Sequence, residues 1–170
     1  RRKRRRQAPT LHHNGSTRGF KIEVGKLGRA SFPKGFYVYV GSAQKNLRQR
    51  LERHLRNAKR SRGTLQRAPT NKSPGGATAH WHIDYLLPHA KILSIQVFKA
   101  PKEWECRLSK RLARLEGAGI IMKGFGASDC RCPSHLYYFP YRPHLSRNWG
   151  FRDCKIERFK STNLKSRNLK

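Results

Sequence analysis

The sequence is poor in acidic residues, in cysteine and in long apolar runs, and each shortage narrows the class of protein. Nine Asp and Glu stand against 39 Lys and Arg, which gives a formal net charge of +30 over 170 residues. This balance favours nucleic acid as a partner over an anionic membrane surface. No stretch approaches the roughly 18 consecutive apolar residues of a membrane-spanning helix, so no membrane span is expected. Four cysteines are too few for a disulfide-stapled scaffold, which favours a reducing, cytoplasmic location.

The positive charge is concentrated in segments 1–6, 56–79 and 155–170, which show little apolar periodicity. Such segments either solubilise a protein or contact phosphates without sequence preference. Candidates for phosphate contact include three basic residues of the middle segment, namely Arg56, Lys59 and Arg60.

The same pattern predicts the domain organisation. We expect one domain over 19–145, which is a usual length for a single core, with 59–79 as a flexible basic insertion. A disordered basic tail at 1–18 would precede it, and a basic extension at 146–170 would follow it.

Apolar residues recur with periods typical of both strands and helices. Alternation predicts strands over 20–24, 36–40, 91–98 and 136–139. Helical periodicity predicts helices over 43–57, 80–87 and 102–116, the first with Ser42 as its N-cap and with Leu47, Leu51 and Leu55 as its apolar stripe. Interleaved elements of this kind predict a small α+β domain.

Glu105 lies at the edge of the apolar stripe of the third predicted helix, away from its basic face. A carboxylate in that place needs a cation to remain ionised. The cation is either an arginine in a salt bridge or a divalent metal, because one or two carboxylates with waters and phosphate oxygens typically hold Mg²⁺.

Arg50 and His54 are one helical turn apart, beside the leucine stripe of the first predicted helix. Arg50 either passes the core to reach solvent or stabilises charge on a phosphoryl group. In the second case Tyr39, from the preceding strand, would move a proton.

Two further groups of polar residues admit two interpretations each. Cys130, Cys132 and His135 are zinc-ligand types; the fourth ligand is not evident, and Cys154 or a distant histidine would supply it. The alternative is a packed loop with reduced thiols. His80 and Asp84 lie four residues apart, so in a helix they either orient a side chain in a cleft or form a satisfied polar pair.

The segment Gly35–Ala43, followed by Arg50-Leu51-x-x-His54, resembles the second half of the signature of the GIY-YIG nuclease superfamily. Five further strings resemble one branch of that superfamily, which is also found fused to helix-hairpin-helix DNA repair glycosylases. They are VGKLG, FYVYVGSA, RLERHLR, HWHIDYLL and FGASDCRCPSHL, and the Glu105-Cys106 pair accompanies them.

The resemblance implies a sheet of about three antiparallel strands flanked by helices, and a DNA endonuclease that uses Mg²⁺ or Mn²⁺, in DNA repair. Tyr39 would move the proton of the attacking water, Arg50 would hold the phosphate and Glu105 would bind the metal. His54 is a further catalytic candidate. The secondary candidates in these motifs are Tyr37, His82 and Asp84.

One element of the superfamily is missing from this pattern. The family opens with a Gly-x-Tyr strand whose tyrosine lines the site, whereas this sequence has only Gly19-Phe20-Lys21 before Gly25, and residues 10–18 are too polar to predict a strand. Either this strand is degenerate or the sequence begins after it. The alternative function is therefore a non-catalytic module that binds DNA or RNA and has an incomplete site.

Overall fold

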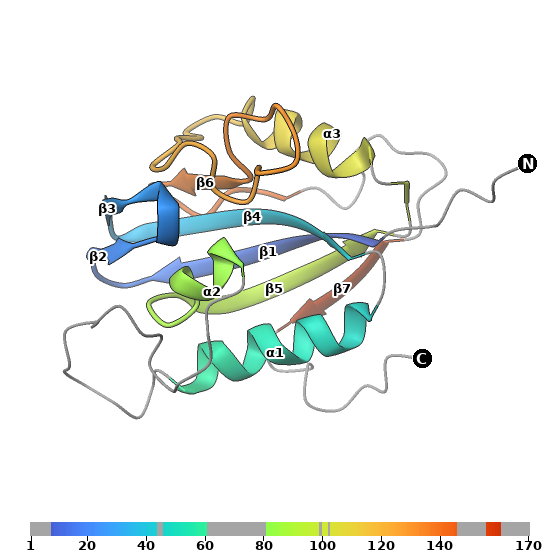
Figure 1. Cartoon of the computed structure of the whole chain (residues 1–170), viewed down its shortest axis with the longest axis horizontal. Helices are drawn as coiled ribbons and strands as arrows, with labels where there is room; N and C mark the ends of the chain where they lie inside the picture. Colours follow the sequence, from blue (N-terminus) through green and yellow to red (C-terminus); the bar gives the residue numbers. More distant parts are fainter. Residues whose placement is uncertain are drawn as a thin grey trace, which may run out of the picture.

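The computed structural model describes residues 8–43, 46–60, 81–98, 100–101, 103–145 and 156–160. In this part of the chain, five antiparallel strands form one sheet in the order β6-β4-β1-β5-β7, and β2 and β3 form a separate hairpin (Figure 1). The strands are β1 (Ala8–Ser16), β2 (Phe20–Glu23), β3 (Arg29–Phe32), β4 (Gly35–Ala43), β5 (Lys91–Phe98), β6 (Leu136–Phe139) and β7 (Ile156–Lys160). The helices are α1 (Leu47–Arg60), α2 (His82–Leu86) and α3 (Glu103–Leu112), with a 3₁₀ turn at Gly25–Leu27.

The α+β class with antiparallel pairing is confirmed, but the expected sheet of about three strands is too small. The expectation of a disordered tail over 1–18 was wrong for residues 8–16, which form the central strand β1. Pairing with β4 on one side and β5 on the other satisfies its backbone groups. Its polar side chains Thr10, His12 and Asn14 are buried, so an apolar alternation could not reveal it.

Two other predicted segment boundaries also differ from the structure. Within the expected C-terminal extension, residues 156–160 form β7 and pair with β5. Lys59 and Arg60 belong to α1 and not to a flexible insertion, while residues 61–79 lie outside the described part of the chain.

Side chains alternate across the sheet, so its two faces form two cores. On one face Tyr37 and Tyr39 pack with Leu51 of α1 and with residues of α2. On the other face Val38 and Val40 pack with apolar residues of α3. The leucine stripe of α1 is confirmed, since Leu51 is buried and its neighbours along the stripe pack against the same core.

Two helix boundaries were predicted too wide. The pairing of β4 with β1 continues to Ala43, so Ser42 stays in the strand and does not cap α1, which begins only at Leu47. Helix α3 ends at Leu112, and turns follow it. Within the described residues, every helix is too short or too polar to cross a membrane.

Candidate functional site

Arg50 of α1 and Glu105 of α3 meet at Ser42, near the end of β4. The Ser42 hydroxyl donates a hydrogen bond to Oε2 of Glu105, and Nη1 of Arg50 donates one to the Ser42 carbonyl. Ser42 therefore joins a cation and a carboxylate that lie 55 positions apart in sequence. The sequence predicted Ser42 only as a helix cap and did not predict its contacts with Arg50 and Glu105.

Tyr39 lies beside this pair and is only 5% exposed. Burial raises the pKa of its phenol well above 10, and the nearby charges of Arg50 and Glu105 act on it in opposite directions. The ring meets Phe125 edge-on, with 6.0 Å between the centroids. Tyr39 is thus a fixed phenol that keeps its proton at neutral pH. The structure brings together the three residues that the resemblance singled out.

Two glycines make the space that the Tyr39 ring occupies. A Cβ at Gly41 would lie 2.9 Å from the ring, and a Cβ at Gly126 would lie 2.7 Å from it. Gly126 also has a φ of +72°, which disfavours any side chain. The sequence signal Tyr-x-Gly thus has a packing reason, because residues two apart in a strand lie on the same face.

We expect Gly126→Ala to lower the free energy of unfolding by about 2–4 kcal/mol, from the left-handed backbone and the overpacked ring together. The control is Gly124→Ala in the same loop. Its φ is +76°, but the new Cβ would meet only the end of the Leu27 side chain, at 3.3 Å. Urea unfolding of both variants measures the difference. Equal losses would contradict the proposed crowding at Tyr39.

The Arg50 guanidinium is held on a second side by Trp81, with its central carbon 4.0 Å from the centre of the indole ring. Burial lowers the pKa of Arg50, but arginine stays charged in proteins. The snorkelling interpretation of Arg50 does not describe this arrangement, since the side chain is held between Trp81 and the Ser42 carbonyl.

His54, one helical turn after Arg50 on α1, lies in the core and is 2% exposed. Its ring meets the ring of His12 of β1 edge-on, with 5.1 Å between the ring centroids. The centroid of the His12 ring lies 5.9 Å from that of the Tyr39 ring. Burial lowers the pKa of His54 to about 2 and that of His12 to about 3. Both histidines are therefore neutral near pH 7. His12 was missed because no strand was predicted around it.

His82 and Asp84 hold the surroundings of the site in place. Nδ1 of His82 accepts the backbone N–H of Gly126 at 2.8 Å, which anchors the loop beside Tyr39. Asp84 accepts hydrogen bonds from the Asn57 side chain and from the Trp81 backbone. Asp84 therefore has hydrogen-bond partners in Asn57 and Trp81, whereas its predicted pairing with His80 lies outside the described residues.

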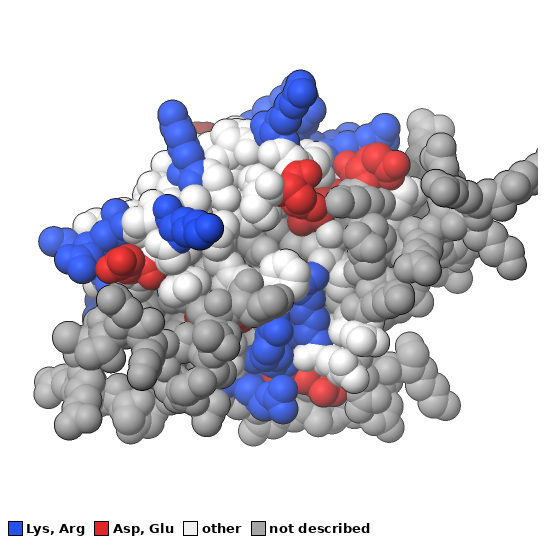
Figure 2. Space-filling model, in the orientation of Figure 1, with Lys and Arg blue, Asp and Glu red and all other residues white. Residues whose placement is uncertain are grey.

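Tyr37 and Arg56 make none of the contacts described above. The Tyr37 hydroxyl donates to the Pro33 carbonyl, and its ring packs between the hairpin and β6, so it is a core residue. Arg56 is exposed on α1, whereas the side chains of Lys59 and Arg60 lie outside the description. Figure 2 shows Lys and Arg side chains over both the α1 side and the α3 side of this view.

Four potential metal ligands meet between α3 and the loop that precedes β6. The ligand atoms of Cys106, Cys130, Cys132 and His135 all lie within 4.8 Å of one another, so this group can hold a metal ion. Cys106, which follows Glu105 on α3, provides the fourth ligand that the sequence did not reveal; Cys154 lies outside the described residues.

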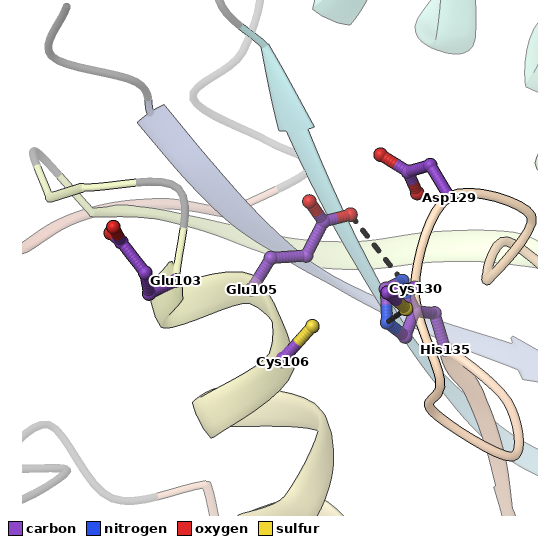
Figure 3. Close-up of a pocket in the computed structure, with 6 residues that line it drawn as sticks. All are labelled: Glu103, Glu105, Cys106, Asp129, Cys130 and His135. Atoms are coloured by element: carbon purple, nitrogen blue, oxygen red, sulfur yellow. Dashed lines mark hydrogen bonds and ion pairs between the residues drawn. The ribbon is translucent and has the colours of Figure 1, made fainter.

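Glu105 contacts both Ser42 and a member of this group, His135. Figure 3 shows the Glu105 carboxylate directed at the His135 ring. Oε1 of Glu105 lies 3.3 Å from Nδ1 of His135, and Nε2 of the same ring lies 3.4 Å from Sγ of Cys130. Burial opposes protonation of His135, but contacts with Glu105 and Cys132 raise its pKa overall. A pocket of about 240 Å³ is lined by Glu105, His135, Cys130 and Cys106, together with two more carboxylates, Glu103 and Asp129.

Comparison with known proteins gives one result. No curated protein matches the chain, and no solved structure does. A family model described as a domain of unknown function, DUF123, matches residues 15–152, from the end of β1 to beyond β6. Because this match spans most of the 170 residues, the chain belongs to the DUF123 family.

Proposed function

We propose that this chain is a divalent-metal-dependent DNA endonuclease of the GIY-YIG type, which hydrolyses phosphodiester bonds. The meeting of Arg50 and Glu105 at Ser42, beside the Tyr39 phenol, carries the proposal. Phosphodiester hydrolysis needs charge stabilisation and proton movement, and these side chains can supply both. The net charge of +30 supplies the attraction to a polyanion.

Arg50 is suited to hold the scissile phosphate. Its contacts with Trp81 and the Ser42 carbonyl fix the guanidinium before substrate arrives. A guanidinium has five N–H donors, and the bond to Ser42 uses one of them. Charged hydrogen bonds to phosphate are among the strong ones in proteins.

Glu105 is the residue that would hold Mg²⁺ or Mn²⁺, with Asp129 lining the same pocket. The donor chemistry fits, because hard cations prefer carboxylate oxygens, and each oxygen keeps a lone pair beyond its contact with Ser42 or His135. When bound, such an ion lowers the pKa of a coordinated water and offsets phosphate charge.

Tyr39 would donate or relay a proton. Its raised pKa makes the phenolate scarce at neutral pH, so the phenol is not the resting base. The neighbouring Arg50 stabilises the phenolate in any step that forms it, because a positive charge lowers the pKa of a phenol.

A non-catalytic module that binds DNA or RNA is the second candidate function. Both carboxylate oxygens of Glu105 already face protein groups, Ser42 and His135. In addition, β1 lacks the Gly-x-Tyr element that the resemblance leads one to expect, and His12 is the residue opposite Tyr39. These two observations favour retention of the fold without the complete chemistry.

Incubation with branched, nicked and linear DNA, in Mg²⁺ or Mn²⁺, tests the endonuclease. We expect Glu105→Gln to cut about 10²- to 10³-fold more slowly than wild type, the usual loss when a charge-stabilising group is removed. The control is Glu116→Gln, which removes the same charge from an exposed position beyond α3. Failure of the wild type to cut any substrate while it still binds DNA would favour the second candidate.

A further inference from the structure

We infer that Cys106, Cys130, Cys132 and His135 form a structural zinc centre that fixes the loop before β6 to α3. The four side chains come from two parts of the chain, separated by 23 positions between Cys106 and Cys130. Their ligand atoms nevertheless lie within 4.8 Å of one another. This inference does not depend on the proposed nuclease.

The spacing of the ligand atoms suits a tetrahedral ion. With zinc–sulfur bonds of about 2.3 Å, neighbouring sulfurs in a tetrahedron lie about 3.8 Å apart. The contact between Sγ of Cys130 and Nε2 of His135, 3.4 Å, is already at such a distance. The other ligand atoms lie within 4.8 Å of one another. Displacements of up to about 1 Å therefore suffice to bring them to the distances of a tetrahedral zinc site.

The donor types select zinc over Mg²⁺. Three thiols and an imidazole are soft and borderline ligands, whereas Mg²⁺ takes oxygen. Four protein ligands leave no open position for substrate, which is the mark of a structural rather than a catalytic centre. All three cysteines are free thiols and half-buried, so none is lost to a disulfide.

His135 is held as zinc-binding histidines usually are. One ring nitrogen, Nε2, faces the thiols, and the other, Nδ1, faces the Glu105 carboxylate at 3.3 Å. A carboxylate there fixes the tautomer and the orientation of the ring. Towards this centre Glu105 is a positioning residue, and its second oxygen faces Ser42.

The centre would add to the hydrogen bonds that hold a segment without regular secondary structure. Residues 123–135 contain turns and bends but no helix or strand. This segment carries Phe125 and Gly126, which pack against Tyr39. A zinc ion bound to Cys130, Cys132 and His135 would keep that wall of the Tyr39 pocket in place.

Metal analysis of the full chain, purified under reducing conditions, tests the centre directly. We expect about one zinc per chain, bound in wild type and in Cys154→Ser and absent from Cys106→Ser. Cys154 is the control because it is the remaining cysteine and the alternative fourth ligand. Zinc lost from Cys154→Ser, or kept in Cys106→Ser, would overturn this ligand set, and wild type that binds no added zinc would overturn the centre itself.

Two measurements keep the test decisive if Cys106→Ser fails to fold. Cobalt-loaded wild type should show the strong absorption of a tetrahedral thiolate complex, whereas a weak octahedral spectrum would overturn the assignment. Removal of zinc by a chelator should lower the Tm by about 10 °C or more, since structural zinc contributes several kcal/mol to folding. An unchanged Tm after complete removal would refute the structural role.

Glu105→Gln separates this inference from the proposed nuclease. The amide oxygen can still accept a hydrogen bond from His135, so zinc content should stay near one per chain while DNA cleavage is lost. A variant that keeps both zinc and cleavage contradicts the assignment of Glu105 to the nuclease metal alone, and a wild type that binds zinc but cuts no DNA contradicts the nuclease alone. A wild type without zinc that cuts DNA contradicts the zinc centre alone.

Discussion

Cleavage of DNA by Tyr39→Phe is expected to be about 10²- to 10⁴-fold slower than cleavage by wild type, the usual loss when a positioned proton donor is removed. The substitution keeps the ring, which fills the space between Gly41 and Gly126. It removes only the hydroxyl, whose proton is held by a raised pKa. The fold should therefore survive, and cleavage rates measured at saturating DNA report the chemistry.

Tyr37→Phe is the matched control for that experiment. Tyr37 lies two residues earlier on the same face of β4, and its hydroxyl donates to the Pro33 carbonyl. Its loss should cost about 1 kcal/mol of stability, the usual net value of a hydrogen bond, and leave cleavage unchanged. Equal cleavage by the two variants would remove Tyr39 from the mechanism.

The protein should lose stability steeply in acid because of His12 and His54. Their pKa values in the folded state, about 3 and about 2, lie far below the ordinary value of 6.5. Below about pH 6.5 the unfolded chain therefore binds protons that the folded chain does not. Each histidine then lowers the free energy of unfolding by up to about 1.4 kcal/mol per pH unit, so the pair contributes about 2.7 kcal/mol per unit between about pH 5.5 and 4.

Urea unfolding at a series of pH values measures this slope. We expect His54→Leu to remove about half of it, because an apolar side chain of similar size has no proton to bind. Among the described residues, neither ring nitrogen of His54 has a hydrogen-bond partner, so the variant should be no less stable than wild type at pH 7. A slope retained in His54→Leu would show that other groups titrate instead.

The sequence patterns predicted the strands whose buried side chains are apolar and missed the strand whose buried side chains are polar. The strand β5 was predicted with its observed bounds, and the alternation at residues 36–40 located β4. The strand β1 was missed because its inward positions carry Thr10, His12 and Asn14. The periodicity of one sequence cannot show that strands on both sides form hydrogen bonds with the backbone of such a strand.

The site was predictable in its parts but not in its connections. The wheel of α3 placed Glu105 at the edge of the buried face, and the structure has it buried there. Its contacts with Ser42 and His135 depend on how β4 and the loop before β6 approach α3, which no local pattern encodes. Cys106 was missed for the same reason, since its partners follow more than twenty positions later.

The position of β1 between β4 and β5 has a consequence for how the protein is handled. The family match begins at Gly15, so a gene trimmed to that match would lack nearly all of β1. The strand pairs β4–β6 and β5–β7 would then have no common neighbour, and the sheet would separate into two ribbons. Residues 8–16 are therefore needed to hold the two halves of the sheet together.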